Sequence, residues 1–272
     1  MASPALAPVI VEENTKQYSN IISFDAARSI LDAKKAQPKS PKARAYNGGG
    51  AVVGKSSEVY PFRTKDEIKA MIDVFDKHIM DATDEHHRQL ASRNKLLFLV
   101  GINVGLRASD LVTLQWSFFL NGMSDGEYDF KEFYTLQPKK TRKQKKFVKL
   151  FFNNTVKRAI TEYLNEFPTE NIDDYLFESR EGEGAITTKT MWRIIKNSAK
   201  EAGLSDNYGS HSLRKSFGFW AWHNAEDKDR ALVILSQIFN HSSVMTTRKY
   251  IGIMDDEMKD VFNSVELGLD FI

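Results

Sequence analysis

The feature that most constrains the fold is the period of the apolar residues, which is helical over most of the chain. A capping box, Thr64-x-x-Glu67, opens the first long segment of this kind, over residues 64–79. Further segments with helical period cover residues 90–101, 153–167, 187–204, 231–239 and 255–265. Residues 127–151 instead alternate apolar and polar side chains on both sides of a polar turn, which is typical of a β-hairpin. We therefore expect a mainly α-helical fold with a small antiparallel β-sheet (α+β).

Composition narrows the class of protein. The chain has 272 residues, which fit one large or two small domains, and its net charge of +2 indicates no particular class of partner. The absence of cysteine excludes disulfides and cysteine-ligated zinc. No apolar run reaches the ~18 residues that span a bilayer, and the N-terminus lacks the basic start and apolar stretch of a signal peptide. We expect a soluble cytoplasmic protein without a membrane partner.

The composition changes near residue 60. Residues 1–60 combine proline, serine, lysine and three consecutive glycines, which is typical of a linker, whereas residues 61–272 hold the periodic segments. We expect an N-terminal basic arm over residues 1–60 and one folded domain over residues 61–272. The lysines of the arm suit contact with a DNA backbone, and they equally suit a solvated tail.

Residues 211–250 carry side chains that suit chemistry on a phosphate. His211 and Arg214 are three residues apart, so both project from one face of a helix start. The apolar segment 231–239 predicts a buried helix that would carry His241 back toward that face. Tyr250 comes nine residues after His241. A tyrosine ionises only near pH ~10, so it becomes a useful nucleophile where cationic groups stabilise and align an electrophile.

Another arginine, Arg107, follows Gly105-Leu106 and precedes an apolar helical pattern. Taken alone, an arginine at such a place is more often a surface residue or the partner of an acid. Asp110 lies three residues later and can pair with a guanidinium to fix the orientation of its fork. An acid at a helix start that interacts favourably with the helix dipole is the alternative interpretation.

In this order, the motifs GLRASDL (105–111), HSLR (211–214) and NHSSVMTTRKYI (240–251) resemble those of the tyrosine recombinase (phage integrase) family. The resemblance runs from about Pro61 to Phe262, and the ordered set is specific although each motif alone is weak. It implies a catalytic set, supported by Asp110, that consists of Arg107, Lys140, His211, Arg214, His241 and Tyr250. Where the family often has Leu-Gly-His, this chain has Phe239-Asn240-His241.

The turn of the expected hairpin is strongly basic, with seven basic residues and no acid from Lys139 to Lys149. Such a turn can enter a groove or follow phosphates, and it can also be merely solvated. The resemblance places a catalytic lysine here, for which Lys140 is the best match and Lys139 and Lys143 are the alternatives. The helix over residues 187–204 has an expected inward Trp192 and a basic outer face. We expect DNA contacts from Lys139, Arg142, Lys143, Lys145, Lys146, Lys189, Arg193 and Lys196.

The resemblance implies a site-specific DNA recombinase that cleaves and rejoins DNA through a 3′-phosphotyrosyl intermediate, in integration, excision or resolution of a mobile element or replicon. No metal or other cofactor is expected, because guanidinium and imidazolium groups supply the positive charge. The alternatives are a non-catalytic DNA-binding regulator on the same fold and a type IB topoisomerase-like enzyme.

The expected partners are double-stranded recombination sites, other copies of the chain in a tetrameric synapse, and an accessory DNA-bending factor. Residues 255–272 would dock onto a neighbouring copy. The expected location is the nucleoid of a prokaryotic cell, with the gene on the chromosome, a phage or a mobile element. The family commonly has a separate helical DNA-binding domain before the catalytic domain, and residues 1–60 leave room for one or two helices.

Overall fold

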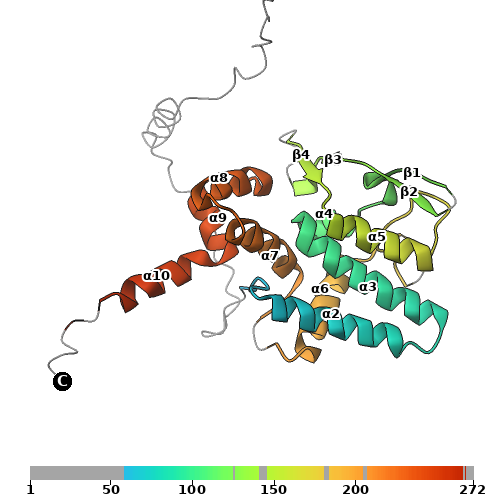
Figure 1. Ribbon diagram of the computed structural model, residues 1–272, viewed down its shortest axis with the longest axis horizontal. Coiled ribbons are helices and arrows are strands. Elements are labelled where there is room, and N and C mark those ends of the chain that lie inside the picture. Colours follow the sequence, from blue (N-terminus) through green and yellow to red (C-terminus); the bar gives the residue numbers. More distant parts are fainter. Residues whose placement is uncertain are drawn as a thin grey trace, which may run out of the picture. The chain divides into compact units, whose positions relative to one another are not determined.

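The computed structural model describes residues 58–124, 126–140, 146–180, 184–204, 207–265 and 267. Nearly all of the expected N-terminal arm lies outside these residues, as do Arg142, Lys143 and Lys145 of the basic turn and most of the terminal segment 266–272. The described part is mainly helical and contains two small antiparallel sheets (Figure 1). The expected fold class is therefore confirmed.

The helical elements lie close to the segments that the apolar period predicts. Thr64 and Glu67 form the expected capping box at the start of the first one. One prediction began too late, because Asp84 caps a helix that starts five residues before Leu90 by accepting the amide hydrogen of His87. The elements are α2 (Lys65–Met80), α3 (Glu85–Val104), α4 (Ala108–Leu111), η1 (Trp116–Phe118), α5 (Asn154–Glu166), α6 (Thr188–Glu201), α7 (Ser210–His223), α8 (Lys228–Phe239), α9 (Val244–Ile251) and α10 (Ile253–Asn263).

The strands form two separate pairs. They are β1 (Leu120–Ser124), β2 (Glu127–Phe130), β3 (Phe133–Leu136) and β4 (Val148–Phe151), with β1 paired to β2 and β3 paired to β4. In the second pair, Phe133 lies opposite Phe151 and Leu136 opposite Val148. The sequence predicted the β3–β4 hairpin but not β1, whose residues LNGMS lack an alternating apolar pattern.

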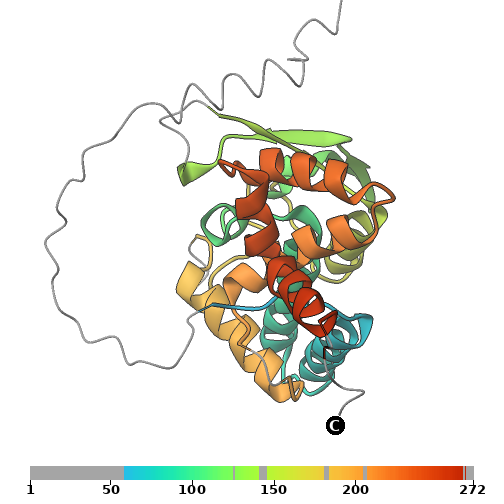
Figure 2. The same cartoon turned by 90° about the vertical axis from the view of Figure 1, so that its left-hand side faces the viewer.

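The helices form two apolar clusters. The larger one is centred on buried residues of α2, α3, α5 and α6, and the smaller one joins Phe219 of α7 to Leu232, Leu235 and Phe239 of α8 and Ile251 of α9. Helix α7 contacts α3 on one side and α8 and α9 on the other (Figure 1). The β3–β4 hairpin lies beside α8 in both views (Figures 1 and 2). Segments far apart in the sequence thus meet around the start of α7.

A glycine makes the turn that brings Arg107 to this place. Gly105 ends α3 in the left-handed conformation, with φ of 62°, which glycine adopts without steric cost. A Cβ atom there would lie 2.3 Å from the ring of Phe217 on α7. The chain can therefore pass close to α7 and place Arg107 directly before α4.

In the part of the chain that the structure covers, each helix is too short or too polar to cross a membrane.

Candidate active site

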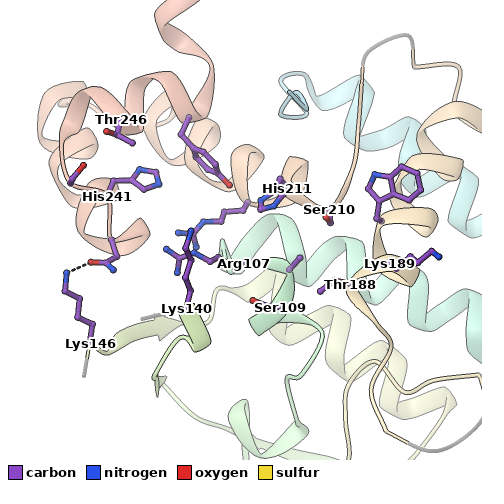
Figure 3. A pocket seen from close by; sticks show the side chains of 16 residues that line it. Arg107, Ser109, Lys140, Lys146, Thr188, Lys189, Ser210, His211, His241 and Thr246 are labelled. Atoms are coloured by element: carbon purple, nitrogen blue, oxygen red, sulfur yellow. Dashed lines mark hydrogen bonds between the residues drawn. The ribbon is translucent and has the colours of Figure 1, made fainter. Parts of the chain in front are cut away.

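A cleft of about 1040 Å³ opens between α6, the start of α7, the α8–α9 region and the β3–β4 hairpin (Figure 3). Its lining includes every side chain that the resemblance assigns to catalysis. These are Arg107, Lys140, His211, Arg214, His241 and Tyr250. Among the described residues of the lining, none is acidic, and Lys146 and Lys189 add further positive charge. Such a cleft is suited to bind an anion.

Arg214 is the most rigidly held of these groups. It is 4% exposed, its Nη1 donates to the carbonyl oxygen of Gly105 at 2.5 Å, and its Nη2 donates to that of Phe239 at 3.1 Å. The guanidinium also lies 4.2 Å from the centroid of the Phe239 ring. Burial lowers the pKa of Arg214 to about 10, so the group is still protonated at neutral pH. Its fork is fixed before any ligand arrives.

The second guanidinium converges on the same carbonyl group. Arg107 is the residue before α4, and its Nη2 donates to the Phe239 oxygen at 3.1 Å. This oxygen lies at the C-terminal end of α8, where carbonyl groups lack helical partners and carry partial negative charge. The guanidinium groups of Arg107 and Arg214 carry like charges and repel each other. An anion bound in the cleft beside both groups would offset that repulsion.

His241 is held by the turn between α8 and α9. Asn240 adopts the left-handed conformation, with φ of 52°, and the amide of His241 donates to the carbonyl of Ser236 at 2.9 Å. The Nδ1 atom of His241 lies 2.9 Å from the hydroxyl oxygen of Thr247, which is fully buried. Burial, and then the charges of Arg214 and Arg107, lower the pKa of His241 to about 4. The imidazole is therefore neutral in the free protein at pH 7.

Tyr250 lies beside this histidine, with 5.1 Å between the two ring centroids and 5.5 Å between its ring and that of Phe239. Burial raises the pKa of Tyr250, and the charges of Arg214 and Arg107 oppose that rise. The phenol is thus protonated at neutral pH and must lose its proton during any attack. Desolvation, followed by the charges of Arg214 and Lys215, lowers the pKa of His211, so a neutral imidazole is available nearby to accept a proton.

Lys140 reaches the cleft from the β3–β4 hairpin (Figure 3). The hairpin is fastened at its other arm by the ammonium of Lys146, which donates to the side-chain oxygen of Asn240 at 2.7 Å. Lys139 is exposed and lies outside the cleft lining. Among the alternatives for the catalytic lysine, the geometry favours Lys140, and Lys143 lies outside the described residues.

Asp110, which was expected to pair with a guanidinium, contacts the backbone beside Lys140. It is 3% exposed, and its Oδ1 accepts the backbone amide hydrogen of Lys139 at 2.9 Å. Its Oδ2 is buried without a hydrogen-bond partner, and within the described part of the chain it forms no ion pair with either guanidinium. Its charge still favours protonated Arg214. In the free protein Asp110 thus holds the backbone next to Lys140, and its expected support of an arginine fork stays a prediction.

The basic residues expected to contact DNA are distributed unevenly. Lys189 lies on the cleft wall (Figure 3), whereas Arg193 and Lys196 are exposed on α6 outside it. The expectation that Trp192 points inward is wrong, because it is 41% exposed and lines the cleft. Its ring stacks under the ammonium of Lys196 at 4.7 Å, and a flat apolar surface of this kind suits contact with a sugar or base.

Several lining residues were not identified from the sequence. The polar side chains of Thr246 and Ser210 lie in the cleft (Figure 3), and Asn240 connects the hairpin to the His241 turn. The sequence could have indicated the turn at Asn240. This residue stands where the family often has glycine, and asparagine tolerates positive φ better than most residues. Thr246 and Ser210 are common residue types without a distinctive pattern.

The sequence is similar to known integrases. Residues 63–257 match the phage integrase family. The probable integrase/recombinase YoeC of Bacillus subtilis (strain 168) is 31% identical over 186 residues, which cover 67% of this chain and 92% of that protein. The tyrosine recombinase XerD of Oceanobacillus iheyensis is 26% identical over 181 residues, or 65% of this chain and 55% of XerD. The chain thus spans most of YoeC but only about half of XerD.

Solved structures show the same fold. The XerA recombinase has a TM-score of 0.52 and 21% identity, covering 79% of this chain and 66% of that one. The XerH site-specific recombinase, solved in a post-cleavage complex with a palindromic difH substrate, has a TM-score of 0.51 and 20% identity, covering 88% and 63%. The family match over residues 63–257 and the similarity to YoeC show that the chain belongs to the phage integrase family of tyrosine-type integrases and recombinases.

Proposed function

We propose that this protein is a site-specific DNA recombinase that cleaves and rejoins DNA through a 3′-phosphotyrosyl intermediate. The observation that carries the proposal is the meeting of a tyrosine, two imidazoles and two fixed guanidinium groups in one cleft without an acidic lining residue among those described. The family membership supports the same chemistry. Integration, excision and resolution of a mobile element all use these steps.

Cleavage begins with Tyr250. Its oxygen attacks the scissile phosphorus, forming a bond from the tyrosine oxygen to phosphorus as the bond from phosphorus to the 5′ oxygen breaks. His211 takes the phenolic proton, and Lys140 gives a proton to the departing 5′ oxygen. Religation is the reverse, with a 5′ hydroxyl as the attacking group. The phosphodiester bond energy is kept in the covalent intermediate, so the reaction needs no external energy source.

The cationic groups act on the charge that develops at the phosphate. Arg107 and Arg214 donate to the non-bridging oxygens, and losing one such donor at an active site typically costs ~10²–10³ in rate. A planar guanidinium also matches two phosphate oxygens at once. His241 donates the hydrogen of its free ring nitrogen to one of these oxygens. Hydrogen bonds to backbone carbonyl oxygens already fix both guanidinium groups, so these groups need little reorganisation when the phosphate binds.

The surrounding basic residues would hold the duplex. Lys146 and Lys189 on the cleft, and Arg193 and Lys196 beyond it, suit contacts with the DNA backbone. The XerH site-specific recombinase, which has the same fold, was solved bound to its difH substrate, and this supports DNA as the ligand of this chain. We also expect DNA contacts from Arg142, Lys143 and Lys145, which lie outside the described residues.

The C-terminal helix supports the proposal that several copies associate on DNA. Helix α10 extends away from α7 and α8 in Figure 1 and leaves Met258, Val261 and Phe262 exposed, the last at 76%. An exposed apolar helix face of this kind is suited to a groove on another protein. We infer that residues 255–272 dock onto a neighbouring copy and help to form a tetrameric synapse, with DNA bending supplied by an accessory factor.

A two-site plasmid separates this function from its alternatives. A supercoiled plasmid would carry two copies of the DNA that flanks the protein's own gene, and the products would be separated on a gel. Recombinant circles are the expected result. Relaxation without recombinants would indicate a topoisomerase-like enzyme, and a retarded complex without either product would indicate a DNA-binding regulator.

A further inference from the structure

The six residues before Thr64, the N-cap of α2, are Glu58–Arg63; they lie across helix α7 and are here called the strap. Its centre is firmly anchored. The amide of Phe62 donates to the hydroxyl of Ser216 at 2.7 Å, and the indole nitrogen of Trp220 donates to the carbonyl of Phe62 at 2.9 Å. Phe62 is fully buried and stacks on Tyr208 with 4.4 Å between centroids. The strap is therefore part of the folded unit.

One end of the strap reaches the face of the Tyr250 ring through Lys215. This lysine is 5% exposed, and its ammonium lies 2.8 Å from a carboxylate oxygen of Glu58 and 5.5 Å from the centroid of the Tyr250 ring. A buried ammonium is costly unless it is paired, and Glu58 supplies the pairing charge. The electron-rich face of the phenol attracts the cation and so favours one orientation of the ring.

The other end of the strap closes the helix that carries Tyr250. Arg63 donates from Nη2 to the carbonyl of Gly252 at 2.5 Å and from Nη1 to the carboxylate of Asp256 at 2.7 Å. Gly252 ends α9 with φ of 80°, two residues after Tyr250. A Cβ atom at Gly252 would lie 2.7 Å from the Arg63 Nη2 atom, so the guanidinium sits tightly against this turn.

We propose that the strap sets the position of the Tyr250 nucleophile, with Lys215 and Arg63 as positioning residues. The proposal rests on the role of Tyr250 proposed above. Glu58, Arg63 and Lys215 lie outside the cleft lining, so they do not act through the phosphate. Arg63 acts through the end of the helix that carries Tyr250, whereas Lys215 acts through the Tyr250 ring and also through its charge on His211.

Positioning of this kind matters because α9 has only eight residues and Tyr250 is the last but one of them. Terminal turns of short helices fray easily. A displacement of ~1 Å at a reacting group can cost ~10²-fold in rate. The strap holds Tyr250 from both sides, through the ring face and through the end of its helix.

Amide hydrogen exchange tests the strap without any DNA. In Arg63→Ala, the amides of residues 248–252 should exchange at least ~10-fold faster than in the wild type, because α9 opens locally. Arg158→Ala is the matched control, since it removes an exposed arginine–glutamate pair on α5 and should leave this exchange unchanged. The indole N–H resonance of Trp220 shows whether the strap stays anchored on α7 in each variant.

Single-turnover cleavage of a nicked duplex gives the second measurement. At saturating DNA, Arg63→Ala and Lys215→Met should form the covalent adduct ~10–100-fold more slowly, with an apparent Kd for the duplex within about twofold of the wild type. Asp256→Asn leaves the hydrogen bond from Arg63 to Gly252 in place, so its rate of adduct formation should fall less than that of Arg63→Ala. A Kd change with an unchanged rate would overturn the proposal, as would exchange of residues 248–252 at the wild-type rate in Arg63→Ala. If the wild type forms no adduct, the proposed function fails, and hydrogen exchange alone decides whether the strap holds α9.

Discussion

Lowering the pH should destabilise the free protein through His241. Its pKa is about 4 in the folded chain and near ~6.5 in an unfolded one. Below pH 6.5 the unfolded chain binds a proton that the folded chain excludes, so stability is complete at higher pH and is lost as the pH falls toward 4. At pH 5 the difference between these pKa values corresponds to about 2 kcal/mol. Because the ring is partly exposed to solvent, we expect ~1–2 kcal/mol.

Urea unfolding of the wild type and His241→Gln at pH 7.5 and pH 5.0 measures this effect. Other titrating groups, including His211, are present in both proteins and cancel in the difference. The wild type should lose ~1–2 kcal/mol relative to the variant between these two pH values. A difference that stays constant within about 0.3 kcal/mol would refute the conclusion that the cleft keeps this imidazole neutral.

The same reasoning predicts proton uptake when DNA binds. A phosphate oxygen beside His241 favours the imidazolium and offsets the charges of Arg214 and Arg107 that disfavour it. At pH 6, binding of a duplex should therefore take up protons, measured by titration calorimetry in two buffers with different heats of ionisation. Uptake that is equal in the wild type and in His241→Gln would contradict a contact between His241 and the phosphate.

Other substitutions test separate parts of the site. Asn240→Gly keeps the left-handed turn and removes only the contact with Lys146, so the free energy of unfolding in urea should change by less than about 0.5 kcal/mol. Asn240→Ala should lose ~1–2 kcal/mol, because alanine disfavours positive φ. Equal losses in the two variants would contradict a requirement for positive φ at this residue. Lys140→Ala should slow cleavage by ~10²–10⁴-fold, and a substrate with sulfur at the 5′ bridging position should restore the rate, because a thiolate leaves without protonation. A rate equally slow on both substrates would exclude Lys140 as the general acid. Arg214→Lys cannot make both carbonyl bonds and should lose at least ~10² in cleavage rate, while circular dichroism shows a folded protein; near-normal cleavage would refute a need for the fork.

The helical periods and the ordered motifs predicted the local structure around the site, namely which residues share a helix face and where a helix ends. The spacing of His211 and Arg214 required one helix face, and α7 supplies it. The apolar segment 231–239 forms the C-terminal part of α8 and ends beside the cleft. These are local consequences of the backbone, so a single sequence can carry them.

Contacts across the fold could not be predicted in the same way. Arg107 and Arg214 donate to one carbonyl oxygen, that of Phe239, and nothing local to either arginine specifies this partner. Asp110 follows Arg107 closely enough to suggest a carboxylate–guanidinium pair, yet its carboxylate accepts the amide hydrogen of Lys139, a residue 29 positions away. Trp192 fits the apolar period of α6, but the cleft opens on that side of the helix and leaves its ring exposed.

The contacts of the strap could not be predicted from the sequence either. Glu58 and Lys215 are separated by 157 positions in the sequence, and the segment around Glu58 has the composition of a linker. The hydrogen bonds of Phe62 to Ser216 and Trp220 on α7, together with the Glu58–Lys215 pair, show that this segment belongs to the folded unit.

The central claim is that Tyr250 forms a covalent bond with the 3′ phosphate of cleaved DNA, and trapping the adduct tests it most directly. The protein would be incubated with nicked duplexes that tile the DNA flanking its own gene, so that a short 5′ fragment diffuses away after cleavage. After denaturation and digestion, mass spectrometry should find a 3′ nucleotide on the peptide containing Tyr250, and Tyr250→Phe should give no adduct. DNA that binds on a native gel without any adduct, or an adduct on another residue, would contradict the account.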